Sequence, residues 1–133
     1  MPSTHTSKVK LTGSDRYMIK IPTTSAGVNA AKNVLPDGIR CLGTALFSVH
    51  QAIAASQAEM LAISPYFNET RAHVQVELWP DVEDPATQHP MANRMIHIRD
   101  TYKKLAKETG KTQPLIKAAS YVPFCIHWRD TDG

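Results

Sequence analysis

Cysteine and histidine side chains at Cys125, His127 and His73 are the first candidates for chemistry in this sequence. Cys125 and His127 lie two positions apart in the alternating run Phe124–Trp128, so in a strand both side chains would lie on one face. An imidazole can activate a thiol as a nucleophile, and both groups bind zinc. Zinc needs three or four ligands, however, and the close pairs that usually supply them are absent. Neighbours along one strand also rarely point their reactive atoms at each other, so we predict no catalytic residue, no metal site and no cofactor.

Basic residues are concentrated between positions 94 and 117. They are Arg94, Arg99, Lys103, Lys104, Lys107, Lys111 and Lys117, against Asp100 and Glu108. Such a group could neutralise the phosphates of a nucleic acid or contact an acidic protein surface. The solvated side of an ordinary surface helix also carries lysines, and no aromatic platform accompanies these. We expect partner binding through the first six: Arg94, Arg99, Lys103, Lys104, Lys107 and Lys111.

An acidic stretch with Asp81, Glu83 and Asp84 could bind a divalent cation through carboxylate oxygens. Its spacing matches no calcium-binding loop, and an exposed acidic turn explains it. The sequence contains no Walker loop, dinucleotide fingerprint, nucleophile elbow or HExxH helix. These absences count against the nucleotide-dependent enzymes and hydrolases that use those motifs.

The length of 133 residues and the 20% of charged residues are ordinary for one globular domain. We expect a flexible arm at residues 1–7, a single domain at 8–130 and a short tail at 131–133. No signal-peptide pattern is visible, and Cys41 and Cys125 lie in different predicted elements, so a reduced, cytoplasmic protein is expected. The net charge of +3 is too small to imply a polyanionic partner by itself.

We expect the stretch from Asp37 to Ile63 to be the element around which the chain is organised. Apolar residues recur there at steps of three and four: Ile39, Leu42, Leu46, Val49, Ile53 and Met60. This spacing predicts one long helix, which Asp37 would cap and Pro65 would end. No charged residue lies between Arg40 and Glu59, and polar residues argue against a membrane span. We expect a helix covered on more than one side, by its own chain or by a second copy that contacts Gly43, Thr44, Phe47, Ser48, Gln51 and Ala55.

Shorter patterns predict the remaining elements. In the run Arg16–Ile21, Ile19 and Ile21 alternate with Met18 and Lys20, as expected for a strand. The other predicted elements are its hairpin partner Lys8–Leu11, a short helix at Ala26–Leu35 capped by Ser25, a strand at Ala72–Trp79, a helix from Pro90 to Thr109, helical turns within Thr112–Ala119 and a strand at Phe124–Trp128.

These elements predict an α+β two-layer sandwich. Two long amphipathic helices would cover one face of a small, mostly antiparallel sheet, in the order β-β-α-β-α-β. The function that we expect is that of a small, non-catalytic, self-associating binding or assembly protein, with a homodimer and a nucleic acid as its most concrete partners. The alternative is a small cytosolic enzyme with a site around His73, Cys125 and His127 at the edge of the sheet.

Overall fold

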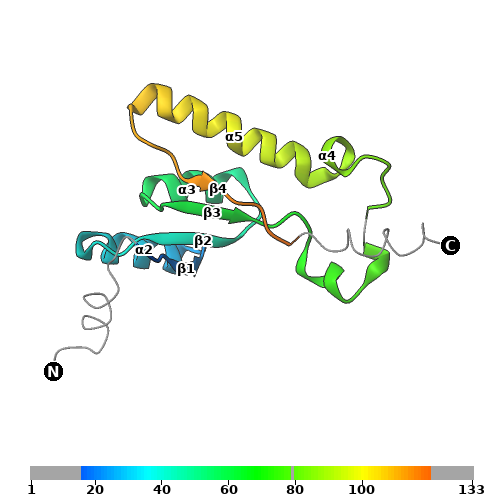
Figure 1. Cartoon of the computed structure of the whole chain (residues 1–133), viewed down its shortest axis with the longest axis horizontal. Coiled ribbons are helices and arrows are strands. Elements are labelled where there is room, and N and C mark those ends of the chain that lie inside the picture. The colour runs from blue at the N-terminus through cyan, green and yellow to red at the C-terminus, as the bar shows by residue number, and fades with distance from the viewer. Residues whose placement is uncertain (1–15, 79, 121–133) are drawn as a thin grey trace.

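A sheet of four parallel strands lies at the centre of the computed structural model, which describes residues 16–78 and 80–120 (Figure 1). The strands are β1 (Ile19–Pro22), β2 (Cys41–Leu46), β3 (Ala62–Pro65) and β4 (Leu115–Ile116), and their order in the sheet is their order in the chain. Each neighbouring pair is parallel. The carboxyl ends of the strands therefore meet at one edge of the sheet.

Helices occupy the connections between the strands. α2 (Ser25–Val34) joins β1 to β2, α3 (Val49–Gln57) joins β2 to β3, and α5 (Pro90–Thr109) lies between β3 and β4. The same connections contain the short helix α4 (Pro85–Gln88) and 3-10 turns at Leu35–Asp37, Thr70–His73 and Val76–Leu78. Because parallel strands need a long crossover, this alternation of strands and helices suits a parallel sheet.

The hydrophobic core lies between one face of the sheet and the helices. Cys41 of β2 and Ile63 of β3 are buried there together with Ala52 and Ala55 of α3 and Ile98 of α5. The alanines present little side-chain bulk, so α3 can pack closely against the strands. This packing assigns one face of the sheet to the core.

The opposite face of the sheet carries a lysine. Side chains alternate along a strand, and Ile19 and Ile21 pack against the core, so Lys20 between them belongs to the other face. The register pairs Lys20 with Leu42 of β2, and Leu42 with Ala62 of β3. We call the face defined by Lys20, Leu42 and Ala62 the lysine face.

The predicted α+β sandwich with a mostly antiparallel sheet is wrong, because every strand pair in the described residues is parallel. β1 pairs with β2 in a parallel register that sets Ile19 beside Cys41. The proposed hairpin partner, Lys8–Leu11, lies outside the described residues. So do the whole predicted arm at residues 1–7, the predicted tail and the strand at Phe124–Trp128.

The predicted helix from Asp37 to Ile63 is also wrong, since this stretch contains β2, α3 and the first half of β3. Gly38 has a φ of 74° and Ala45 a φ of 50°, and an α-helix does not accommodate this left-handed backbone. Ser48 then caps α3 by accepting a hydrogen bond from the backbone of Gln51.

Two further predictions of secondary structure fail. In the described part of the segment predicted as the strand Ala72–Trp79, the chain forms the 3-10 turns Thr70–His73 and Val76–Leu78, and Val74 is 83% exposed. Within Thr112–Ala119 the chain forms β4 instead of helical turns, because Leu115 and Ile116 pair with Ala62 and Ile63.

The prediction of α5 is confirmed at both ends. The helix begins at Pro90 and ends at Thr109, and Gly110 at its C-cap has a φ of 67°. The short helix after β1 is also present, although Thr24 rather than Ser25 caps it. No helix within the described ranges is long and apolar enough to cross a membrane.

Candidate active site

Lys20 lies within β1, and its side chain is exposed on the lysine face. Thr44 lies two residues beyond Leu42 on the neighbouring strand, and its Oγ1 donates a hydrogen bond of 3.2 Å to the hydroxyl of Tyr66. The backbone of Thr44 also accepts hydrogen bonds from the N–H and Oγ1 of Thr23, which follows β1. An amine and a bonded pair of hydroxyls therefore come from three neighbouring segments of the sheet.

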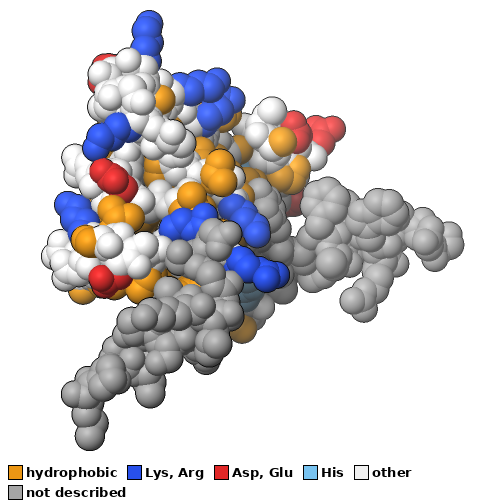
Figure 2. Space-filling model, turned by 60° about the vertical axis from the view of Figure 1, so that its left-hand side comes forward, with side chains coloured by type: hydrophobic (Ala, Val, Ile, Leu, Met, Phe, Trp, Pro, Cys, Tyr) orange, Lys and Arg blue, Asp and Glu red, His pale blue; other side chains and the backbone are white. Residues whose placement is uncertain are grey.

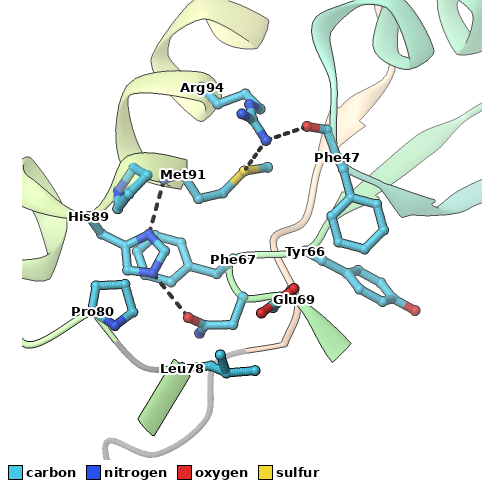
Figure 3. Close-up of a pocket in the computed structure, with 11 residues that line it drawn as sticks. Phe47, Tyr66, Phe67, Glu69, Leu78, Pro80, His89, Met91 and Arg94 are labelled. Atoms are coloured by element: carbon cyan, nitrogen blue, oxygen red, sulfur yellow. Dashed lines mark hydrogen bonds between the residues drawn. The ribbon is translucent and has the colours of Figure 1, made fainter. Parts of the chain in front are cut away.

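A pocket of about 250 Å³ opens beyond the carboxyl ends of β2 and β3 (Figure 3). Its wall combines aromatic, polar and charged side chains, among them Phe47, Tyr66, Asn68, Glu69, His89 and Arg94. These residues follow β2, follow β3 or lie at the start of α5. In sheets of parallel strands, the region outside the carboxyl ends is where ligands bind, so this pocket is the best candidate for a substrate site.

Tyr66 connects the pocket with the lysine face. Its ring contacts the ring of Phe47 edge to face, with centroids 5.1 Å apart and an interplanar angle of 71°. Its hydroxyl is the group that accepts the hydrogen bond from Thr44. Tyr66 is therefore a member both of the pocket wall and of the hydroxyl pair.

Arg94 ties the start of α5 to the end of β2. Its Nη1 donates a hydrogen bond of 2.8 Å to the carbonyl oxygen of Phe47 and lies 3.8 Å from the sulfur of Met91. These contacts hold the guanidinium at the pocket (Figure 3). Arginine has five N–H donors, so the remaining ones can bind an anionic or hydroxyl group of a ligand.

His89 forms another part of the wall and is buried. Its ring stacks on Phe67 with centroids 4.1 Å apart, and its Nε2 lies 3.0 Å from Oδ1 of Asn68. Its Nδ1 accepts a hydrogen bond from the backbone N–H of Met91. Burial lowers the pKa of His89, because the cation loses solvation there.

The structure distributes the predicted basic residues along α5. Arg94 lies at the pocket, whereas Arg99, Lys103, Lys104, Lys107 and Lys111 are exposed along the helix and just beyond it. Ion pairs join Arg99 to Asp100 (2.8 Å), Lys104 to Glu108 (3.9 Å) and Lys111 to Glu59 (3.0 Å). On the face shown in Figure 2, basic side chains lie among acidic and hydrophobic ones. That these residues bind a partner stays a prediction.

The residues predicted to mediate self-association lie in and around β2 and α3. Gly43, Thr44 and Ala55 are buried within the chain, while Phe47, Ser48 and Gln51 are partly buried. A Cβ at Gly43 would lie 2.7 Å from Oγ1 of Thr23 and 2.9 Å from the sulfur of Met60. The small residue at this position thus has a role in internal packing, and self-association through this set stays a prediction.

The structure describes only one member of the proposed cysteine and histidine site. His73 lies on the turn after β3, with its Nε2 2.7 Å from Oγ of Ser120. Cys125 and His127 lie outside the described residues. Of the acidic stretch, Asp84 caps α4 by accepting from the backbone of Ala86. Within the described ranges, no group of three or more His, Cys, Asp or Glu side chains is arranged to hold a metal ion.

Sequence reasoning did not select Lys20 as a site residue. The alternation in Arg16–Ile21 correctly separates Lys20 from Ile19 and Ile21. A lysine alone between isoleucines on a strand is the signal that could have identified it, because a charged side chain in such a strand needs a polar surrounding or a function. Thr44 was selected only as a self-association residue and Tyr66 was not selected, since the two were not expected in neighbouring segments of a sheet.

Comparison with known proteins gives a family match over nearly the whole chain. Residues 6–128 match the model of a family described as transaldolase/fructose-6-phosphate aldolase. The transaldolase of Nostoc punctiforme is 36% identical over 97 residues, which are 73% of this chain and 29% of that protein. The transaldolase of Schizosaccharomyces pombe is 44% identical over 54 residues, which are 41% of this chain and 17% of that protein. The chain thus spans less than a third of the length of these relatives.

These matches contradict the prediction of a non-catalytic binding or assembly protein. The relatives are named as enzymes, so the alternative of a small enzyme fits better, and a nucleic acid or an acidic protein surface has no support as a partner. The fold that the family implies is a TIM-barrel-like α/β fold, in which parallel strands alternate with helices. The parallel sheet with strands in chain order agrees with that fold.

Proposed function

We propose, because this chain belongs to the transaldolase/fructose-6-phosphate aldolase family, that it makes and breaks carbon–carbon bonds of a phosphorylated ketose through an imine on Lys20. The observation that carries this proposal is the exposure of Lys20 on the lysine face, beside the strand that contains Thr44. A lysine amine is the protein nucleophile that forms Schiff bases with carbonyl compounds.

The chemistry follows from the need for an electron sink. The neutral amine of Lys20 adds to the ketone carbon, and loss of water gives an iminium ion. When a base removes the proton of the hydroxyl on the second carbon from the iminium carbon, the bond between that carbon and the carbon next to the iminium breaks. The electron pair of this bond forms the carbon–carbon double bond of an enamine, the π pair of the iminium moves to the nitrogen, and the carbon that bears the hydroxyl leaves as an aldehyde. Addition of the enamine to a second aldehyde, or its protonation, followed by hydrolysis, restores the free amine.

The neighbouring groups suit a ketose with a charged end. The hydroxyls of Thr44 and Tyr66 can hold a substrate hydroxyl or a water molecule near the reacting carbon. The pocket beyond the strands offers the remaining N–H donors of Arg94 to the rest of the substrate. An arginine is well suited to a phosphate because it binds with more than one N–H group.

Trapping the imine tests the proposal. The protein is incubated with fructose 6-phosphate and sodium borohydride, which reduces an imine to a stable amine, and the modified lysine is identified by peptide mass spectrometry. We expect the adduct on Lys20. Lys20→Arg keeps the positive charge but removes the nucleophilic amine, so this variant should lose both the adduct and cleavage activity.

Lys117→Arg is the matched control. Lys117 is exposed directly after β4, and its backbone N–H donates to the carbonyl oxygen of Ile63. It therefore tests whether any exposed lysine near this sheet reacts. The control variant should retain the adduct on Lys20. An adduct on Lys117 alone, or full activity in Lys20→Arg, would overturn the proposal.

Self-association and a cytoplasmic location, both expected from the sequence, are further parts of the proposal. Leu115 is 67% exposed and Ile116 39% exposed on the short strand β4, and a second copy is one surface that could cover them. Light scattering over a range of concentrations measures the mass in solution. A monomer mass at every concentration would contradict the dimer.

A further inference from the structure

A chain of hydrogen bonds runs from the N-cap of α5, in the wall of the pocket, to the segment after β4. Nε2 of His89 lies 3.0 Å from Oδ1 of Asn68, and Nδ2 of Asn68 donates to the carbonyl oxygen of Ser120, also at 3.0 Å. Oγ of Ser120 in turn donates to the carbonyl oxygen of Asn68 and contacts Nε2 of His73. His89 and Asn68 are both buried, with 7% and 5% of their surface exposed.

The contacts determine which nitrogen of His89 carries the proton. Nδ1 accepts from the backbone N–H of Met91, so it carries no hydrogen. In the neutral ring the hydrogen is then on Nε2, which donates it to Oδ1 of Asn68. The amide of Asn68 is consistent with this, because its other end must donate to the carbonyl of Ser120. A second proton on His89 would turn Nδ1 into a donor that faces the N–H of Met91.

The same contacts hold three segments of the pocket wall together. His89 is the N-cap of α5, Asn68 belongs to the segment after β3, and Ser120 ends the described part of the chain after β4. Ser120 has a φ of 62°, a left-handed conformation that costs free energy for a residue other than glycine. The two hydrogen bonds with Asn68 help to maintain this conformation.

We propose that His89 is a positioning residue that holds the pocket in its binding shape only while the imidazole is neutral. On protonation, Nδ1 gains a hydrogen and His89 stops capping α5. The ring must then turn away from the N–H of Met91, which disturbs its contact with the segment of Asn68, and that segment also carries Tyr66 and Glu69. The consequence for catalysis rests on the proposed aldolase function. The consequence for the shape of the pocket does not, and it can be measured separately.

The charged groups around His89 favour neither the neutral nor the protonated imidazole strongly. From the segment after β3, Glu69 lines the same pocket, and from α5 Arg94 does so with the opposite charge. His73 reaches the chain of hydrogen bonds only through Ser120. Beside α4, the backbone N–H of His89 donates to the carbonyl of Pro85. Burial lowers the pKa of His89 from its ordinary value of 6.5, so the imidazole is neutral in the folded protein at neutral pH.

The sign of the pH effect follows from this lowered pKa. Between the folded and unfolded pKa values of His89 the unfolded chain binds more protons, so the native state gains stability as the pH rises. The stabilisation that depends on a neutral His89 is fully present above pH 6.5, the ordinary pKa. It is lost as the pH falls through the lowered pKa of His89 in the folded protein. The pocket should therefore open in acid.

NMR spectroscopy of the whole chain tests the inference without any substrate. Long-range proton–nitrogen spectra identify the tautomer of each histidine, and a pH titration follows the backbone amides. We expect His89 to carry its proton on Nε2 at pH 8. The amides of Asn68 and Met91 should shift with the same midpoint as the ring of His89. A proton on Nδ1, or amides that ignore the titration of His89, would overturn the proposal.

Two substitutions separate positioning from folding. In Asn68→Asp, the carboxylate stabilises the imidazolium, so the midpoint of His89 should rise by about one pH unit or more. In His89→Asn, the shorter side chain can still cap α5 but does not titrate and does not reach Asn68. The decrease of activity at acidic pH that His89 causes in the natural chain should then disappear. Activity at pH 8 should be lower than in the natural chain, on the order of tenfold to a hundredfold.

His97→Gln is the control, because His97 is exposed on the same helix. It should leave the midpoint of His89 unchanged. An unchanged midpoint in Asn68→Asp would contradict the inference even if His89→Asn fails to fold. If every variant and the natural chain lack aldolase activity while the NMR results are as expected, the proposed function fails and the positioning role of His89 stands.

Discussion

Tyr102 joins α5 to α3 through one buried contact. Its side chain is 4% exposed, and its hydroxyl donates a hydrogen bond of 2.7 Å to the carbonyl oxygen of Ala52. Burial raises the pKa of Tyr102, so the hydroxyl keeps its proton under all ordinary conditions. Tyr102→Phe removes this donor and should lower the free energy of unfolding by about 1 kcal/mol in a urea titration.

Tyr66→Phe provides the matched comparison for Tyr102→Phe. The hydroxyl of Tyr66 is only partly buried and bonds to Thr44 on the lysine face. Its removal should cost less stability than the change at Tyr102 but should lower cleavage activity, whereas Tyr102→Phe should leave activity unchanged. The reverse pattern would mean that the hydroxyl pair has a structural function and no part in the reaction.

The site residues differ in how far the sequence could predict them. The alternation around Lys20 assigned it to the face away from Ile19 and Ile21, and the structure agrees. The alternation could not predict which side chains lie near Lys20 on that face, because Thr44 and Tyr66 come from segments that were predicted as helix and loop. A single lysine acquires a chemical interpretation only when the groups beside it are known.

At the scale of elements, the failure between Asp37 and Ile63 has a physical cause. Strands in a parallel sheet are covered on both faces, so they appear as short apolar runs without period-two alternation. β2 and β3 are such runs, and α3 between them is rich in alanine. Large apolar residues of β2, of α3 and of the segments beside them happened to fall at helical spacing. Periodicity alone cannot separate short buried strands from a buried helix.

The opposite error occurred at Ala72–Trp79, where a clear alternation did not form a strand. Val74 is exposed there, and the backbone of Val74 donates to Arg71 within a 3-10 turn. In contrast, both ends of α5 were predicted correctly, because Pro90 and Gly110 mark them independently of tertiary contacts. Local signals predicted local structure, whereas the pairing of strands depended on contacts distant in the sequence.

Gln51 at the start of α3 links the helix to the ends of β1 and β2. Its Oε1 accepts from the N–H groups of Phe47 and Ser48, and its Nε2 donates to the carbonyl oxygens of Thr23 and Ala45. Gln51→Glu keeps the shape and the two acceptor contacts but leaves both carbonyl oxygens facing a carboxylate. We expect a loss of roughly 1–3 kcal/mol in the free energy of unfolding, measured by urea titration.

Ser48→Ala is the control for Gln51→Glu, since it removes the other half of the same capping box. This change should cost about 1 kcal/mol. Because the side chain of Ser48 hydrogen-bonds to Gln51 and not to Thr23 or Ala45, a cost larger than that of Gln51→Glu would mean that the link to the two strands contributes little.

At the scale of the whole molecule, the core of helices and strands should open as a unit. Cys41 is a sensitive reporter of this opening, because it is 4% exposed between β1 and β3 and belongs to the core cluster. Burial also raises the pKa of its thiol, so the reactive thiolate is disfavoured in the folded state. In Cys125→Ser, Cys41 is the remaining cysteine of the sequence.

Alkylation of Cys41 in this variant, followed by mass spectrometry, measures how often the core opens. We expect the thiol to react at least about a thousandfold more slowly than in urea-unfolded protein, as for a domain with a typical free energy of unfolding. The rate should rise steeply with urea, because global opening exposes a large surface. Fructose 6-phosphate should slow the reaction further if it binds the native state alone. Rapid alkylation that does not depend on urea would show instead that β2 opens locally, and the lysine face would then lack the rigid support that an imine-forming lysine needs.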